Sequence, residues 1–251
     1  MNRASQATAS SETDGNRLFL IACAWGVHLY TALGAVFGLL AIHYAAIDDY
    51  RASFIAMAVT IAIDASDGTL ARFVNVKKRV PGFDGALLDN IVDYLTYVVA
   101  PVFLMIRAGM VIGSLGLTIA GFVLIASAYQ FCQADAKTPD NFFLGFPSYW
   151  NLVVFYLYCL RTGPAFNEVI VALLAVMVFV PIKYIYPSRT EALRPLTLSL
   201  AIVWGVVTIA MLPSLPACNP ILLYLSLAYV AYYFIVSFAL HARSMMVHAA
   251  S

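Results

Sequence analysis

Four aspartates lie in stretches that are otherwise apolar enough to enter a lipid bilayer. Asp64 and Asp67 are three residues apart, and Asp89 and Asp93 are four residues apart. An acid near the centre of a membrane-spanning helix costs about 2.5–3.5 kcal/mol, and carboxylates that met without a counter-charge would repel one another and take up protons. Hard divalent cations such as Mg²⁺ or Mn²⁺ bind oxygen ligands. Two such ions held about 3.5–4 Å apart form a site for phosphoryl transfer.

The spacing of these acids predicts that they line facing sides of two helices. Gly68 and Ala71 follow the first pair, and at roughly 100° per residue these two positions and both acids fall within an arc of about 100°. Gly85, Asp89 and Asp93 step by four and form a second stripe. A 12-residue loop joins the two segments, so we expect antiparallel neighbours whose acidic stripes face each other. The small residues would leave room for a bulky ligand.

Basic residues beside the acids allow two readings. Arg72 can offer a planar fork of donors to a pyrophosphate. Alternatively, the acids only form ion pairs with the basic residues that follow them, namely Arg72, Lys77, Lys78 and Arg79. Ion pairing alone would not require the regular spacing of the acids or the small residues among them.

The composition requires a membrane around these elements. The chain has 251 residues, of which 63% are hydrophobic and 11% charged, and its mean hydropathy is +0.87. Soluble domains are roughly 45–50% apolar and about 25% charged, so this chain has too few charges to cover a water-facing surface. A net charge of +1 argues against nucleic-acid binding, which needs a basic patch.

Charges, prolines and glycines divide the apolar sequence into about eight transmembrane helices, each needing about 20 apolar residues. We therefore predict an all-α polytopic membrane bundle. It comprises a polar N-terminal tail (1–17), one transmembrane domain (18–245) and a C-terminal tail (246–251). The expected spans are 18–47, 51–72, 86–106, 109–132, 147–161, 166–186, 196–212 and 219–240.

The basic residues predict the orientation of this bundle. Cytoplasmic loops carry an excess of Lys and Arg. With eight spans and the N-terminus inside, eleven basic residues fall on the inner side and three on the outer side. Both termini and the acidic stripes are then cytoplasmic. Within the first span, Gly34-x-x-x-Gly38 would allow another helix to approach closely.

The segment 64–93 resembles the signature of the CDP-alcohol phosphotransferase family, D-x2-D-G-x2-A-R followed by G-x3-D-x3-D. All eight fixed positions match, and they are Asp64, Asp67, Gly68, Ala71, Arg72, Gly85, Asp89 and Asp93. The resemblance implies transfer from a CDP-linked donor to an alcohol with release of CMP. It also implies Mn²⁺ or Mg²⁺ as cofactor, with two divalent ions, and it is compatible with a homodimer.

The same resemblance implies a role for each matching residue. Asp64, Asp67, Asp89 and Asp93 would hold metal, and Asp93 would also be the general base. The CDP site would be lined by the first acid and the remaining fixed positions, namely Asp64, Gly68, Ala71, Arg72 and Gly85. A carboxylate within hydrogen-bond reach of an alcohol can accept its proton as attack begins.

The gap between the two halves of the signature points to one acceptor. With 12 residues, this gap is longer than in most family members. In its length the chain resembles the bacterial branch of the family that joins choline directly to CDP-diacylglycerol at the inner membrane. A quaternary ammonium binds to aromatic faces, and the aromatic candidates near the acids are Trp25, His28, Tyr30, Tyr94 and Tyr97. Serine, inositol or glycerol phosphate remain open as acceptors, since Lys183, Arg189 and Arg194 could bind a phosphate.

Two readings of a different class also remain open. Membrane acids carry protons or divalent ions in transporters, for which we would expect inverted repeats or paired broken helices, and neither is visible in the sequence. A purely structural membrane scaffold would tolerate Asp89→Asn and Asp93→Asn. The segment 64–93 therefore favours the enzyme.

Overall fold

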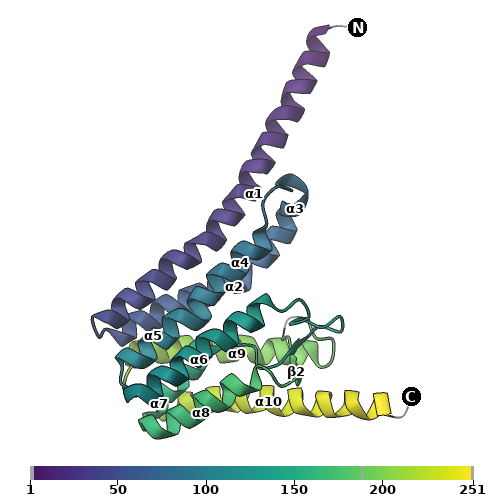
Figure 1. The fold of residues 1–251 in the computed structure, drawn as a ribbon. Helices are drawn as coiled ribbons and strands as arrows, with labels where there is room; N and C mark the ends of the chain where they lie inside the picture. Colours follow the sequence, from purple (N-terminus) through teal and green to yellow (C-terminus); the bar gives the residue numbers. More distant parts are fainter. Residues whose placement is uncertain (1–2, 188, 250–251) are drawn as a thin grey trace.

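The structure, a computed structural model, describes residues 3–187 and 189–249 as a bundle of helices with one small sheet (Figure 1). The first three long helical segments carry the predicted site and are α1 (Arg3–Ala46), α2 (Tyr50–Val74) and a compound helix made of α4 (Gly85–Asp93), a π-helical turn η1 (Tyr94–Val99) and α5 (Ala100–Arg107). The other elements are α3 (Val76–Arg79), α6 (Gly113–Cys132), β1 (Phe142–Leu144), α7 (Trp150–Leu160), α8 (Pro164–Met177), β2 (Lys183–Ile185), α9 (Arg194–Met211), η2 (Leu212–Ser214) and α10 (Pro220–Ala249).

The helical membrane architecture agrees with the prediction. Among the described residues, six helices are long and apolar enough to cross a bilayer, and the two shorter apolar helices α7 and α8 occupy the remaining predicted spans. At 1.5 Å per residue, α7 and α8 are about 17 and 21 Å long, which is less than the roughly 30 Å hydrocarbon thickness. The number of full crossings therefore stays a prediction.

One predicted span end is wrong. The span expected at 166–186 ends as a helix at Met177, because the chain then bends and forms β2, which pairs antiparallel with β1. Tyr184 lies opposite Phe143 in this register. Helix α1 is continuous from Arg3, and α10 continues past residue 245. The division into a membrane domain and two tails stays a prediction.

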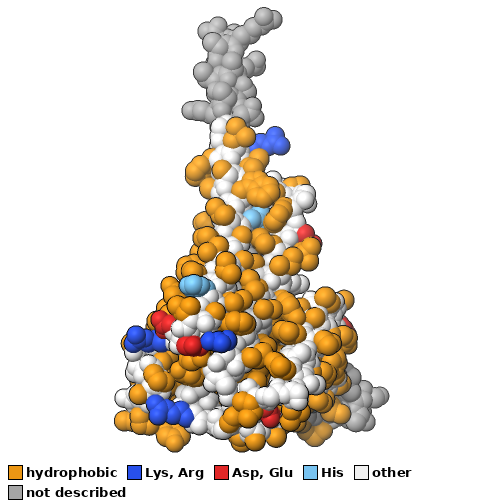
Figure 2. Space-filling model, turned by 60° about the vertical axis from the view of Figure 1, so that its left-hand side comes forward, with side chains coloured by type: hydrophobic (Ala, Val, Ile, Leu, Met, Phe, Trp, Pro, Cys, Tyr) orange, Lys and Arg blue, Asp and Glu red, His pale blue; other side chains and the backbone are white. Residues whose placement is uncertain are grey.

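Apolar side chains cover the outer faces of the long helices, as a lipid environment requires (Figure 2). On α9, Ile202, Val206 and Ile209 are spaced by four and three residues and are each more than 60% exposed. Soluble proteins rarely expose apolar patches of this extent. The exposed stripe is therefore the surface that contacts lipid.

Aspartates at two helix starts place the site-bearing segments. The Asp49 carboxylate accepts a hydrogen bond from Ala52 N at 3.0 Å and caps α2. The Asp84 carboxylate accepts from Ala86 N at 3.1 Å and Leu87 N at 3.0 Å. Side-chain oxygens at this position satisfy the free N–H groups of a first helical turn. The second cap fixes the start of α4, so that Asp89 and Asp93 follow at set distances along it.

The glycine pair of α1 produces the close packing that its spacing predicts. A Cβ atom on Gly34 would lie 2.6 Å from Val92 Cγ1, and one on Gly38 would lie 3.1 Å from side-chain atoms of Leu95 and Thr96. Without side chains at these two positions, α1 packs directly on α4 and η1. This packing holds the second acidic stripe beside α1.

The connections between helices form two groups, separated by the length of α6. In the first group, Arg107 pairs with Asp48 at 2.8 Å, and Asn167 Nδ2 donates to Met110 O at 2.8 Å. In the second group, the strand pair β1–β2 joins the connection before α7 to the one after α8. The α7–α8 pair therefore leaves and returns to the same end of the bundle, as two adjacent crossings would.

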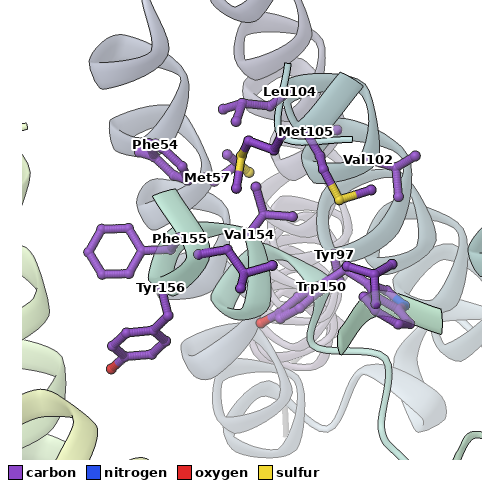
Figure 3. Close-up of a cluster of buried hydrophobic side chains, with 14 of the residues drawn as sticks. Phe54, Met57, Tyr97, Val102, Leu104, Met105, Trp150, Val154, Phe155 and Tyr156 are labelled. Atoms are coloured by element: carbon purple, nitrogen blue, oxygen red, sulfur yellow. The ribbon is translucent and has the colours of Figure 1, made fainter. Parts of the chain in front are cut away.

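The largest apolar core lies between α2, α5 and α7 (Figure 3). Leu104, Met105 and Val154 have no exposed surface there. Trp150 lies in the same core, and its Nε1 donates to Ser127 Oγ at 2.7 Å. Tyr97 is also part of this core. The packing of this core therefore holds Tyr97 in position.

Candidate active site

Three of the four predicted metal-binding acids converge in space. One carboxylate oxygen each of Asp64, Asp89 and Asp93 lies within 4.8 Å of the other two. Asp64 comes from α2, and the other two come from successive turns of α4. The facing acidic stripes predicted from the spacing are therefore present, and three oxygen donors so close together could hold a divalent cation.

Asp67 lies beside this group rather than within it. Its Oδ2 accepts a hydrogen bond from Thr31 Oγ1 on α1 at 2.8 Å, and its side chain is 6% exposed. Asp67 thus connects α2 to α1, one turn further along α2 than Asp64.

Tyr97 orients the acid on α2. Its hydroxyl donates to Asp64 Oδ2 at 2.6 Å, and its side chain is 7% exposed. Tyr97 lies in the π-helical turn that begins directly after Asp93. Single turns of π-helix inside α-helices are frequent at functional sites. Here, the turn carries the hydroxyl that reaches from the third helical segment to α2.

A pocket of about 250 Å³ opens beside the acids. Asp64, Asp89 and Asp93 form one part of its lining. The remainder comes from α4 and η1, from the end of α6, from the connection to α7 and from the residue after β2. It consists of Asn90, Tyr97, Gln130, Phe131, Gln133, Ala134, Ala136, Lys137, Phe143, Pro147, Tyr149 and Tyr186. The cavity therefore combines carboxylates, aromatic rings and a single cationic side chain.

The predicted CDP-site residues occupy different environments. Gly68 leaves open space, and a Cβ there would meet only Arg72 Nη1 at 3.5 Å. Arg72 is exposed, and its Nη2 donates to Thr69 Oγ1 at 2.9 Å. Ala71 is half-buried against the small cluster between α1 and α3. Open space and an exposed guanidinium on this face suit a phosphate-bearing ligand.

The space next to Gly85 is filled by a side chain from α1. A Cβ on Gly85 would lie 2.6 Å from His28 Cε1. The His28 ring is 7% exposed, and its centroid is 4.4 Å from that of Phe83. Its Nε2 is buried without a hydrogen-bond partner. In this structure, the missing side chain of Gly85 accommodates a histidine ring from α1.

Of the five aromatic candidates for the acceptor, only Tyr97 lines the pocket with the acids. Trp25 packs with Phe83, with ring centroids 5.2 Å apart, in the His28 cluster. The hydroxyls of Tyr30 and Ser66 are hydrogen-bonded at 2.9 Å, and Tyr94 Oη donates to Leu124 O at 3.0 Å. Four of the five candidates therefore have packing partners outside this cavity.

The ion-pair explanation for the acids is not supported. Among the side chains that the structure describes (15–187 and 189–246), the two ion pairs are Arg107–Asp48 and Lys183–Asp140, and neither involves the acidic cluster. Hydrogen bonds from Lys183 and Thr138 hold the pKa of Asp140 below its ordinary value, although burial acts in the opposite direction. The basic residues after Arg72 therefore leave the four acids free for another cation.

The sequence reasoning missed most of the aromatic side of the pocket. Phe143, Tyr149 and Tyr186 are distant from the signature in sequence and reach the acids only through the β1–β2 pairing. The chain has 16 Phe and 15 Tyr residues, so aromatic content alone could not single them out. The available signal was the irregular stretch before α7, which is too polar and proline-rich to continue a span.

Curated relatives match most of the chain. A phosphatidylcholine synthase of Legionella pneumophila is 44% identical over 222 residues, covering 86% of this chain and 87% of the relative. That of Legionella bozemanae is 50% identical over 189 residues, covering 72% and 87%. That of Pseudomonas aeruginosa is 36% identical over 210 residues, covering 84% and 88%. No family model matches the chain.

Proposed function

The chain belongs to the phosphatidylcholine synthase family, and from this membership we propose that it transfers the phosphatidyl group of CDP-diacylglycerol to choline and releases CMP. The observation that carries the proposal is the convergence of Asp64, Asp89 and Asp93 at the edge of a pocket in a multi-pass membrane bundle. This family name agrees with the resemblance of residues 64–93 to the CDP-alcohol phosphotransferases.

The acidic cluster would hold the divalent cofactor. Asp64, Asp89 and Asp93 offer oxygens close enough for one ion, and Asp67, next to Asp89, would contribute to a second. Carboxylate oxygens suit Mg²⁺ and Mn²⁺ equally. When bound, such ions offset the negative charge that develops on the leaving CMP.

Residues on the open face of α2 would bind the nucleotide part of the donor. The small side chains of Gly68 and Ala71 leave space there, and the Arg72 guanidinium can donate to the pyrophosphate. Gly85 would join this site if the His28 ring moves. The acyl chains of the donor would stay in the lipid beside the exposed apolar faces of the helices.

We assign proton transfer to Asp93, which lines the pocket together with the other acids. Its carboxylate would accept the proton of the choline hydroxyl as the oxygen attacks the phosphorus that carries diacylglycerol. A new bond forms between the choline oxygen and that phosphorus. The bond from the same phosphorus to the bridging oxygen breaks, and CMP leaves with the electron pair. No covalent enzyme intermediate is part of this scheme.

The enzyme would act at the inner face of the bacterial cytoplasmic membrane. The excess of Lys and Arg on the connections at the site end supports this orientation. Both termini would then lie in the cytoplasm, where CMP is released. Dimer formation stays a prediction.

The pocket lining favours choline over an acceptor that carries a phosphate. Lys183 is paired with Asp140 at 2.7 Å, and the guanidinium of Arg189 lies over Tyr186, 5.4 Å from the ring centroid. Neither residue, nor Arg194, lines the pocket that contains the acids. Aromatic rings and carboxylates suit an ammonium better than a phosphate.

The test is a reconstitution of purified protein with CDP-diacylglycerol and labelled alcohols. We expect phosphatidylcholine and CMP in equal amounts when choline and Mn²⁺ or Mg²⁺ are present. A phospholipid formed from serine, inositol or glycerol phosphate, with none from choline, would overturn the acceptor. Transport of divalent ions without CMP release would instead establish a transporter.

A further inference from the structure

We propose that choline is recognised by four aromatic rings, Tyr97, Tyr149, Phe143 and Tyr186, which we call the ring wall. This inference rests on the proposed function and names the residues that bind the acceptor's ammonium. All four residues lie outside the signature segment 64–93. Phe143 lies in β1, and Tyr186 directly follows β2. The proposal therefore assigns acceptor specificity to the connections around α7 and α8, apart from the acids that perform the chemistry.

The four rings form a continuous series that begins at the acids. Tyr97, whose hydroxyl is bonded to Asp64, has its ring centroid 6.1 Å from that of Tyr149. Tyr149 and Phe143 are also 6.1 Å apart and nearly perpendicular, at 86°. Phe143 stacks on Tyr186 at 4.6 Å. All four rings line the same pocket, so the series offers π-electron surface at increasing distance from the acids.

Cationic side chains of the chain itself lie over one ring of the ring wall, Tyr186. Lys137 Nζ lies over the Tyr186 ring, 6.0 Å from its centroid, and Lys137 also lines the pocket. Aromatic faces attract cations through the negative charge of their π-electrons, and several rings together bind quaternary ammonium groups. The trimethylammonium of choline would lie against the ring wall, with its hydroxyl directed to Asp93.

The experiment measures choline kinetics in variants of the ring wall. Tyr149→Leu and Tyr186→Leu remove a π face but keep an apolar side chain, whereas Tyr149→Phe and Tyr186→Phe keep the face. Tyr224→Leu on α10, where the tyrosine is 69% exposed, is the matched control. Purified variants would be assayed with choline, with ethanolamine, and with 3,3-dimethylbutanol, the uncharged carbon analogue of choline.

We expect each leucine variant to raise the KM for choline about 5- to 30-fold, the range for a cation–π contact that is partly to fully desolvated. The KM for CDP-diacylglycerol should stay near the wild-type value in every variant, and the choline KM should stay near it in the control. The phenylalanine variants keep the π face, so their choline KM should rise less than that of the leucine variants. The uncharged analogue should be a poor acceptor for the wild type and should differ little between wild type and leucine variants, whereas the KM for ethanolamine, which is a cation, should rise in the leucine variants.

Two outcomes would overturn the inference. One is an unchanged choline KM in both leucine variants while wild-type protein makes phosphatidylcholine. The other is an uncharged analogue that the wild type uses as well as choline. If the wild type itself forms no phosphatidylcholine, the proposed function fails instead, so the two failures are distinguishable. Retained CDP-diacylglycerol KM values identify variants that are folded.

Discussion

Asp93 is assigned both to proton transfer and to the metal-binding group, so Mn²⁺ binding has to be measured together with the kinetics of its variant. Asparagine keeps the size of the side chain and one oxygen but accepts a proton far less readily. We expect Asp93→Asn to lower kcat about 10²- to 10⁴-fold, the usual contribution of a general base, with a much smaller change in either KM. Steady-state kinetics of CMP release would measure this effect.

The matched control for this prediction is Asp48→Asn at the opposite end of the bundle. Asp48 is an exposed acid paired with Arg107, and exposed ion pairs contribute about 0–1 kcal/mol. Its substitution should leave kcat unchanged. Full activity in Asp93→Asn would show that another group accepts the proton.

Gly85 and His28 form a pair that a double substitution can examine. Alanine at position 85 would place a Cβ 2.6 Å from His28 Cε1, and overpacking of this kind costs about 1–3 kcal/mol. We expect Gly85→Ala to reduce activity and thermal stability. Adding His28→Ala should recover most of both, because the clash is removed. If stability recovers and activity does not, Gly85 serves the CDP ligand directly.

At the scale of elements, the helix periodicity correctly predicted that acids on α2 and α4 face each other. Steps of three and four residues placed Asp64 and the α4 acids on facing stripes, because 3.6 residues per turn fix the direction of each side chain around the helix axis. The spacing could not separate Asp67 from the group of three, since its position depends on Thr31 of α1. It also could not reveal the π-helical turn that carries Tyr97.

The ring wall lay beyond the reach of sequence periodicity for a different reason. Strand pairing between β1 and β2 joins segments about forty residues apart, and each strand has only three residues. Such short strands have no period that can be recognised. The apolar stretch up to residue 186 therefore resembled the end of a span, and the aromatic residues on it resembled lipid-facing side chains.

The packing of α1 on α4 yields a prediction for one glycine. Gly34→Val would insert methyl groups where a Cβ already lies 2.6 Å from Val92 Cγ1, so α4 would have to move away from α1. We expect a loss of about 1–3 kcal/mol in stability and a large fall in activity, because Asp89 and Asp93 move with α4. Thermal denaturation in detergent and CMP release would measure the two effects.

Gly26 on the same helix provides the control. No atom lies within 4 Å of a Cβ built on Gly26, so Gly26→Val should be tolerated. Equal losses in both variants would indicate that glycine matters for α1 itself rather than for its contact with α4.

At the scale of the whole molecule, the account depends on which end of the bundle faces the cytoplasm. Lys78 and Arg161 are both exposed and belong to opposite groups of connections. Single cysteines at these positions, in a chain whose native cysteines are replaced by alanine, can be labelled with a membrane-impermeant maleimide. We expect Lys78→Cys to react only in inside-out vesicles and Arg161→Cys only in intact spheroplasts. Labelling of both from the same side would contradict the three crossings that the predicted spans place between Lys78 and Arg161.

The central claim is that carboxylates from α2 and α4 bind divalent metal together, and Mn²⁺ binding tests it most directly. Electron paramagnetic resonance of purified protein titrated with Mn²⁺ distinguishes bound from free ion without any substrate. The account predicts bound Mn²⁺ in the wild type and in Asp48→Asn, and little or none when Asp64, Asp89 and Asp93 are all replaced by asparagine. Undiminished Mn²⁺ binding in that triple variant would contradict it.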